Sequence, residues 1–213
     1  MSLEDVERNF GRRFARFVTN VVVARPRLWR LFRTPLRLQF DRLAPVWESM
    51  RSPESFAPLE RALDAVTRPP GRALDLGTGT GAAARRVAER FPGAEVIGVD
   101  LSEDMLEEAR RSTPTEFRDR IRYEKADGSR LPFEDGSFDL VVLANMIPFS
   151  DELERITAPD GTLVISFSAG PETPIWVPPE RLRSDLSRRG FAEFADFQAG
   201  AGTALLARKP ARG

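Results

Sequence analysis

The residues with the clearest chemical potential lie in one short segment, residues 73–81, which reads ALDLGTGTG. An apolar run that predicts a buried strand leads here into a glycine turn, and the residues after the turn predict a helix. Glycines tolerate positive φ and let a ligand approach the backbone closely, and the start of a helix offers unpaired N–H groups. Asp100 follows at the end of the next predicted strand, where its carboxylate could accept hydrogen bonds from both hydroxyls of a ribose. The turn and the acid together indicate a ligand that contains adenosine.

Two classes of adenosine ligand fit this pattern, and one carboxylate separates them. Gly77, Gly79 and Ala82 have the spacing of the dinucleotide fingerprint in its Gly/Ala form. Asp75 lies two residues before the first glycine, where a carboxylate would repel a pyrophosphate but suit the ammonium of an amino-acid moiety. Nicotinamide chemistry also lacks a catalyst, because the single tyrosine, Tyr123, has no Lys four residues later. A ligand with an amino-acid group is therefore favoured, and a nicotinamide dinucleotide stays as the alternative.

The composition narrows the chemistry further. The 213 residues include no His and no Cys, which excludes a Ser-His-Asp triad, thiolate nucleophiles, disulfides and zinc–thiolate sites. A chain of this length, 41% hydrophobic, predicts one folded unit with a sizeable core. Residues 1–5 lack the basic start of a signal peptide, and the uncharged run from Phe17 to Ala24 is too short to span a bilayer. We therefore expect a soluble, cytoplasmic protein.

From residue 72 onward, predicted strands and helices alternate. Strands are predicted over 72–76, 95–100, 121–126, 139–143 and 162–168, helices over 81–91, 103–112, 151–157 and 180–189, and a closing hairpin over 191–199 and 203–208. This alternation predicts an α/β fold with a mostly parallel sheet, to which the hairpin adds at least one antiparallel edge strand. We divide the chain into a helical, Arg-rich amino-terminal cap over residues 1–70 and a ligand-binding domain over residues 71–213, which together form one structural unit.

The amino-terminal cap is strongly basic. Residues 1–40 contain nine Arg and three acidic residues, a net charge of +6, although the whole chain is neutral. Apolar residues at helical spacing predict a helix with a buried stripe, formed by Phe10, Phe14, Phe17, Val18, Val21 and Val22. Pro26, Pro35 and Pro45 should break the cap into pieces.

Three interpretations of this basic cap are open. The favoured one is a cap whose Phe/Val stripe packs on the sheet domain, with its Arg side chains solvated or paired with acids. A peripheral membrane contact through residues 1–40 is the second, since an Arg-rich amphipathic helix suits a headgroup interface. Nucleic-acid binding is the third and is disfavoured, because the segment contains no recognisable module.

Four blocks of the chain resemble the motifs of class I S-adenosylmethionine (SAM) dependent methyltransferases. They are residues 74–81 (LDLGTGTG), 99–109 (VDLSEDMLEEA), 125–128 (KADG) and 131–142 (LPFEDGSFDLVV), and the resemblance covers about residues 72–168. It implies a Rossmann-like, doubly wound, seven-stranded sheet with an antiparallel last strand. It also implies a methyltransferase of the small-molecule or quinone type, with SAM as cofactor and S-adenosylhomocysteine as product.

The resemblance also implies roles for particular residues. Gly77 and Gly79 would let the backbone pass under the methionine part of SAM, with Asp75 near its ammonium group. Asp100 would hold the ribose diol, and Leu101 would lie against the adenine face. The remaining members of the expected cofactor site are Asp127, which would accept a hydrogen bond from the adenine amino group, Gly128 beside it, Leu143 and Ala144 next to the sulfonium, and Thr78 and Met105 from the first two blocks.

Methyl transfer from a sulfonium needs no acid, because the leaving group is a neutral thioether. Where many relatives carry His after the fourth strand, this chain has Asn145, which could orient an acceptor oxygen but cannot take its proton. No oxygen-ligand cluster follows that strand, so we expect no metal. Asp41 and Glu48 are the candidate bases from the cap, and we assign no catalytic residue. Phe40 begins a segment similar to the Tyr-Asp-x-x-Ala type that covers SAM, with Phe in place of Tyr.

The sequence thus predicts a SAM-dependent methyltransferase that acts on a small organic acceptor by positioning, without a metal. A SAM-binding sensor without methyl transfer, and a methyltransferase that reaches a membrane lipid or quinone through its basic helix, are the alternatives. The acceptor, the atom that is methylated and the oligomeric state are not specified by the sequence.

Overall fold

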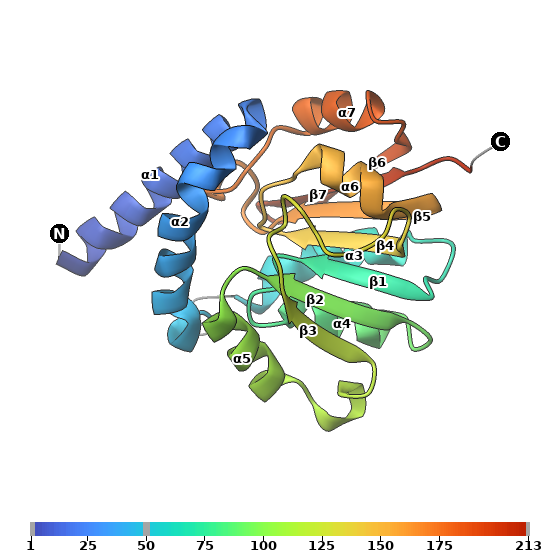
Figure 1. Ribbon diagram of the computed structural model, residues 1–213, viewed down its shortest axis with the longest axis horizontal. Coiled ribbons are helices and arrows are strands. Elements are labelled where there is room, and N and C mark those ends of the chain that lie inside the picture. Colours follow the sequence, from blue (N-terminus) through green and yellow to red (C-terminus); the bar gives the residue numbers. More distant parts are fainter. Residues whose placement is uncertain (1–2, 49–51, 212–213) are drawn as a thin grey trace.

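The computed structural model describes residues 3–48 and 52–211, with a seven-stranded sheet at its centre (Figure 1). The strands are β1 (Arg72–Leu76), β2 (Glu95–Asp100), β3 (Ile121–Lys125), β4 (Phe138–Ala144), β5 (Thr157–Phe167), β6 (Ala192–Ala199) and β7 (Gly202–Arg208). Their order across the sheet is β3-β2-β1-β4-β5-β7-β6. The pairs among β1 to β5 are parallel, and β7 runs antiparallel to both β5 and β6. The predicted Rossmann-like sheet with an antiparallel last strand is therefore confirmed, with β6 rather than β7 at the edge.

Helices cover both faces of this sheet because the strands alternate buried side chains between two apolar clusters. On one face, Ala73, Val96 and Leu140 pack with α3 (Ala57–Asp64) and α4 (Ala82–Arg90). On the other face, Leu74 and Val141 pack with α6 (Ser150–Ile156) and α7 (Pro179–Ser187). The helix α5 (Glu103–Ser112) follows β2, and the short helices η4 (Pro53–Phe56), η5 (Thr115–Phe117) and η6 (Gly170–Glu172) lie in connections.

The amino-terminal segment forms two long helices beside one end of the sheet, at the left of Figure 1. They are α1 (Leu3–Ala24) and α2 (Trp29–Leu43), with short helices η1 (Pro26–Leu28) and η2 (Ala44–Val46) after each. A third apolar cluster holds them in place, in which Val18, Val22 and Trp29 pack against Ile147 and Phe149. Among the described residues, no helix combines the length and apolarity needed to cross a membrane.

The structure of this segment differs from the predictions at Pro35 and at Phe17. The prediction that Pro35 breaks the chain was wrong, since α2 continues through it. Pro35 is exposed, so the backbone carbonyl that loses its partner lies on the solvent side. Phe17 is 55% exposed and does not join the buried stripe, and the side chain of Phe10 lies outside the described ones.

Two arginines of α1 differ from the expectation that they are solvated or paired with acids, because Arg12 and Arg16 donate to backbone carbonyls of residues 171–173. Arg13 of the same helix is exposed, as expected. The division of the chain at residue 70 stays a prediction. The helix α3 lies inside the predicted cap, yet it packs against β5, β6 and β7.

Candidate functional site

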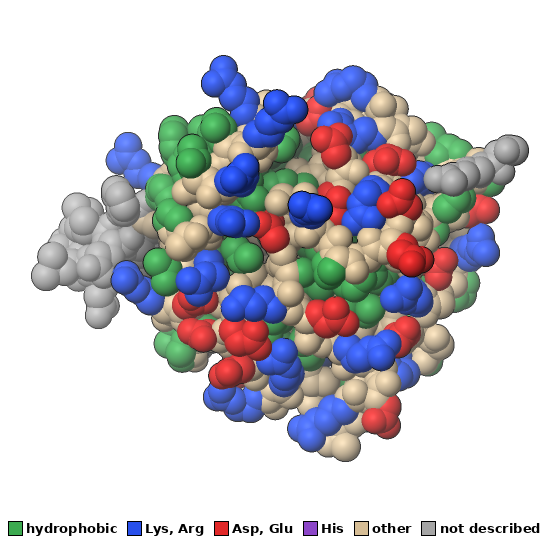
Figure 2. Space-filling view, in the orientation of Figure 1, with side chains coloured by type: hydrophobic (Ala, Val, Ile, Leu, Met, Phe, Trp, Pro, Cys, Tyr) green, Lys and Arg blue, Asp and Glu red, His purple; other side chains and the backbone are tan. Residues whose placement is uncertain are grey.

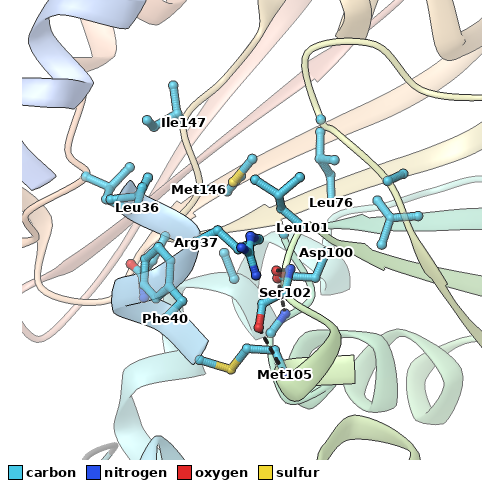
Figure 3. A pocket seen from close by; sticks show the side chains of 18 of the residues that line it. Leu36, Arg37, Phe40, Leu76, Asp100, Leu101, Ser102, Met105, Met146 and Ile147 are labelled. Atoms are coloured by element: carbon cyan, nitrogen blue, oxygen red, sulfur yellow. Dashed lines mark hydrogen bonds between the residues drawn. The ribbon is translucent and has the colours of Figure 1, made fainter. Parts of the chain in front are cut away.

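A cleft opens at the carboxyl ends of β1, β2 and β4, beneath α2 (Figure 3). The empty space in the cleft and at its open mouth, solvent included, is about 780 Å³. We call the part formed by the sheet domain the floor; it comprises Leu76, Gly77, Gly79, Val99, Asp100, Leu101, Ser102, Met105, Ala126, Gly128, Ala144, Asn145, Met146, Ile147 and Ile175. We call the part formed by the amino-terminal segment the roof; it comprises Trp29, Leu36, Arg37, Phe40 and Trp47.

The glycine turn of the floor is fixed by backbone conformation. Gly77, Gly79 and Gly81 have φ angles of +73°, +53° and +80°, a region that side chains disfavour. The N–H groups of Gly77 and Thr78 both donate to the carbonyl of Val99, at 2.9 Å each. The turn is thereby tied to the end of β2, which also carries Asp100.

Asp100 lies at the end of β2, as predicted, and backbone N–H groups hold both oxygens of its carboxylate. Its Oδ2 accepts from the N–H of Gly79 at 2.9 Å, and its Oδ1 accepts from the N–H of Ser102 at 2.9 Å. Burial raises the pKa of this carboxyl above its ordinary value, although the hydrogen bonds from Ser102 and Gly79 oppose the shift. Each oxygen keeps a lone pair for a further donor, so this desolvated carboxylate suits a diol.

Asp75 lies beneath the glycine turn, and its expected contact with the ammonium group of SAM stays a prediction. The residue is 1% exposed, does not line the cleft, and accepts a hydrogen bond at Oδ2 from the hydroxyl of Thr78 at 2.6 Å. It lies at the register position opposite Gly98, where an added Cβ would meet Thr78 Oγ1 at 2.7 Å. In this structure Asp75 therefore braces the glycine turn from beneath.

Asp127 accepts hydrogen bonds from two side chains of α2. Its Oδ1 accepts from the indole N–H of Trp29 at 2.7 Å, and its Oδ2 lies 3.1 Å from a guanidinium nitrogen of Arg33. Partial burial raises the pKa of Asp127, but hydrogen bonds from Ser129, Trp29 and Arg33 outweigh this effect and lower the pKa below its ordinary value. This carboxylate thus links α2 to the loop after β3.

The cleft brings together most of the residues expected at the cofactor site. Seven of them line it, namely Gly77, Gly79, Asp100, Leu101, Met105, Gly128 and Ala144. The other four, Asp75, Thr78, Asp127 and Leu143, do not. The contact of these residues with a cofactor stays a prediction.

No sequence pattern predicted a site role for most of the roof residues or for Met146. An added Cβ on Gly77 would meet Met146 Cγ and Sδ at 2.8 Å, so this thioether lies directly over the glycine turn. The signal for the roof was the apolar spacing of Trp29, Leu36 and Phe40 on one helix face, which predicts a buried stripe but not what it covers. Phe40 packs edge-on against Trp47 with ring centroids 5.5 Å apart.

The candidate bases and Asn145 are already hydrogen bonded. Asp41 accepts from Arg37 at 2.7 Å, and Glu48 accepts from the hydroxyl of Thr80. Asn145 has φ of +57° and exchanges hydrogen bonds with Ser168, so the suggestion that its side chain orients an acceptor is not supported by this arrangement. Within residues 3–48 and 52–211 no group of three or more acidic side chains could hold a metal ion.

Comparison with known proteins finds methyltransferases that are similar to part of this chain. A family model described as a methyltransferase domain matches residues 73–161. The chain is 40% identical over 138 residues to a demethylmenaquinone methyltransferase of Thermus thermophilus, covering 59% of this chain and 62% of that protein. It is 41% identical over 122 residues to a malonyl-[acyl-carrier protein] O-methyltransferase of Halorhodospira halophila, covering 54% of this chain and 40% of that protein. The chain therefore spans less than two thirds of the length of these relatives.

A solved structure agrees on the fold. A SAM-dependent methyltransferase from Aquifex aeolicus superposes with a TM-score of 0.64 at 18% identity, covering 76% of this chain and 95% of that one. The matched segment 73–161 holds the glycine turn, Asp100 and most of the floor, whereas every roof residue precedes it. Residues 73–161 of the chain thus match a methyltransferase domain, and the chain has the fold of a SAM-dependent methyltransferase of known structure.

Proposed function

We propose that this chain binds SAM in the cleft and transfers its methyl group to a small organic acceptor. The observation that carries the proposal is Asp100, a carboxylate held by two backbone N–H groups at the end of β2 beside a glycine turn of positive φ. The residues fit the cofactor at this point, because the missing Cβ of Gly79 leaves room up to Trp47 Nε1, 3.8 Å from where it would lie. The matched methyltransferase domain supports the same ligand.

The floor would hold the cofactor by its nucleoside half. Asp100 would accept from the ribose hydroxyls, and Leu101 and Met105, which line the cleft, would supply apolar surface for the adenine. Asp127 Oδ1 already accepts from Trp29 and Ser129, so the adenine amino group would donate to Oδ2, which accepts from Arg33. When bound, SAM supplies an electrophilic methyl carbon whose leaving group is a neutral thioether.

The protein's own contribution is orientation and exclusion of water. The roof covers the cleft with the apolar and aromatic side chains of Trp29, Leu36, Phe40 and Trp47. Among the described lining residues, the charged groups are Asp100 and Arg37, so no lining side chain stands ready as a general base. Positioning of an acceptor that arrives deprotonated would therefore supply most of the rate, and well-oriented reactions gain about 7–11 kcal/mol this way.

Calorimetry with SAM tests the cofactor site. In an Asp100→Asn variant, the amide nitrogen must face one of the N–H groups of Gly79 or Ser102, so we expect SAM affinity to fall about a hundredfold. An Asp104→Asn variant removes the same charge from an exposed position on α5 and should bind like the wild type. Equal affinity in all three proteins would rule out Asp100 as the ribose-binding acid.

Methyl transfer needs a separate measurement. Incubation with SAM and a panel of phenols, enols and carboxylic acids should release S-adenosylhomocysteine with at least one acceptor, detected by mass spectrometry. Tight SAM binding without release under any condition would instead favour a SAM-binding sensor.

A further inference from the structure

Among the described residues, the exposed large apolar side chains lie in one region. Phe17, Leu31, Leu38 and Val46 are 55%, 68%, 46% and 48% exposed, and they are the large apolar side chains exposed among the described residues. All lie on α1, α2 or η2, while residues 52–211 contribute none to this set. Side chains of this size normally pack inside a protein, so their concentration on one segment indicates a surface that is covered by something else.

The same region carries unpaired positive charge. Residues 11–48 contain nine Arg and two acidic residues. Four of the nine, Arg12, Arg16, Arg33 and Arg37, bond to carbonyls or carboxylates of the protein. The other five make no hydrogen bond or ion pair with any described residue, and they are Arg13, Arg25, Arg27, Arg30 and Arg42. All five are exposed, and Figure 2 shows basic and apolar side chains interspersed over the α1–α2 region, at the left of the view.

The exposed residues of α2 and the residues that line the cleft lie on opposite faces of this helix. Leu31, Leu38 and Arg42 follow one another at intervals of seven and four residues, so they share the outward face. Trp29 and Leu36 are buried on the inward face, toward the cleft. The outward face is thus free to bind a partner without disturbing the residues that line the cleft. We call this exposed set, with the five arginines and Phe17, the outer surface.

We propose that the outer surface docks on an anionic lipid bilayer. Phosphate headgroups satisfy arginines, and the acyl boundary below them takes up Leu and Phe side chains, so a bilayer pairs with both kinds of residue at once. A second copy of the chain would place unpaired arginines opposite one another, which like-charge repulsion disfavours. A nucleic acid would pair with the arginines and leave the leucines in water. The docking surface is independent of the proposed methyl transfer and can be tested without it.

Vesicle flotation of the full chain tests this proposal. We expect the protein to float with vesicles of equal parts phosphatidylcholine and phosphatidylglycerol, not to float with phosphatidylcholine alone, and to be partly released by high salt. An Arg27→Gln/Arg30→Gln/Arg42→Gln variant should lose about a hundredfold in partition coefficient at low salt, at about fivefold per arginine. The matched control replaces Arg68, Arg111 and Arg122 by Gln, which are 73%, 72% and 60% exposed on the sheet domain, and should float like the wild type.

An apolar variant separates a bilayer from the other occupants. Leu31→Gln/Leu38→Gln keeps the helix propensity and the charge of α2, and should lower the partition coefficient about tenfold at both salt concentrations. Each variant should keep the melting temperature and SAM affinity of the wild type, so that loss of flotation is not loss of folding or of the proposed cofactor site.

Four results would overturn the proposal. They are no flotation with anionic vesicles at low salt; equal losses in the two arginine variants; vesicle binding that is insensitive to the leucine changes together with tight binding of duplex DNA; and a dimer in sedimentation that the leucine changes abolish while vesicles are ignored.

Discussion

The floor and the roof of the cleft are held in place by different kinds of interaction. The floor is held mainly by hydrogen bonds of backbone groups. Gly77 and Thr78 donate to Val99, and Asp100 accepts from two backbone N–H groups. The roof is held by side chains, as when Trp29, together with Arg33 on the same helix, binds Asp127. The floor lies largely within the matched methyltransferase domain and the roof precedes it. The comparison shows that backbone geometry holds the floor, where the cofactor is expected, whereas a few side-chain contacts hold the roof that covers it.

Gly77→Ala should have the largest effect on stability, because it strikes the backbone geometry of the floor. Gly77 has a φ of +73°, and an added Cβ would meet Met146 at 2.8 Å. We expect a loss of about 2–3 kcal/mol in the free energy of unfolding, measured by urea denaturation.

A matched glycine and a relieving second change sharpen this prediction. Gly93→Ala places a methyl group where nothing lies within 4 Å and should change stability by less than about 0.5 kcal/mol. Adding Met146→Ala to Gly77→Ala should relieve the steric part of the loss. Equal losses at Gly77 and Gly93 would mean that the turn is not under the constraint described here.

Trp29→Phe should have a smaller effect, confined to the roof. The ring that packs on Phe149, with centroids 5.4 Å apart, is largely kept, while the donor to Asp127 is lost. We expect a loss of about 1–2 kcal/mol and faster hydrogen exchange in α2, with exchange in β1 and β2 unchanged.

Trp176→Phe is the control for Trp29, because the buried Nε1 of Trp176 has no hydrogen-bond partner among the described residues. That substitution removes a donor that was never satisfied, so it should cost less than Trp29→Phe. An equal or greater loss at Trp176 would show that ring size, and not the link to Asp127, stabilises the roof.

The two halves should also differ in their response to pH. Both carboxyls have an ordinary pKa of 3.8, and that of Asp100 is raised by burial while that of Asp127 is lowered by its donors. Asp127 therefore contributes stability above pH 3.8 that is lost as the pH falls through its lower folded-state pKa. Asp100 has the opposite sign, since ionisation of a carboxyl with a raised pKa works against folding at higher pH.

Carbon-13 titration of the aspartate carboxyls measures both groups. We expect the midpoint of Asp100 above that of Asp127, and the midpoint of Asp127 to rise in the Trp29→Phe variant. Coincident midpoints, or an Asp127 midpoint that ignores Trp29, would contradict the proposed role of the roof in holding this carboxylate.

The sequence predicted features of the floor better than the side-chain contacts that hold the roof. The strand before Gly77 and the acid at Asp100 were predictable, because alternating apolar runs and glycine turns are local signals. The hydrogen bond that the buried Asp75 side chain accepts from Thr78 was not predicted, since side-chain direction in a strand depends on which face the sheet presents. The expected role of Asp75 beside an ammonium group stays a prediction. The contact of Trp29 with Asp127 joins residues 98 positions apart and leaves no local pattern. Pro35 led to the wrong prediction of a break in the helix. The helix α2 continues through it, because tertiary packing overrides a helix breaker at an exposed position.

Hydrogen–deuterium exchange of the wild-type chain, with and without saturating SAM, tests the proposed cofactor site most directly. If SAM lies on the floor, the amides of residues 76–82 and 99–105 should exchange more slowly when it is present, because they surround Asp100 and the glycine turn. Edge strands β3 and β6 should not change. Unaltered exchange in both of those segments at saturating SAM would contradict the account.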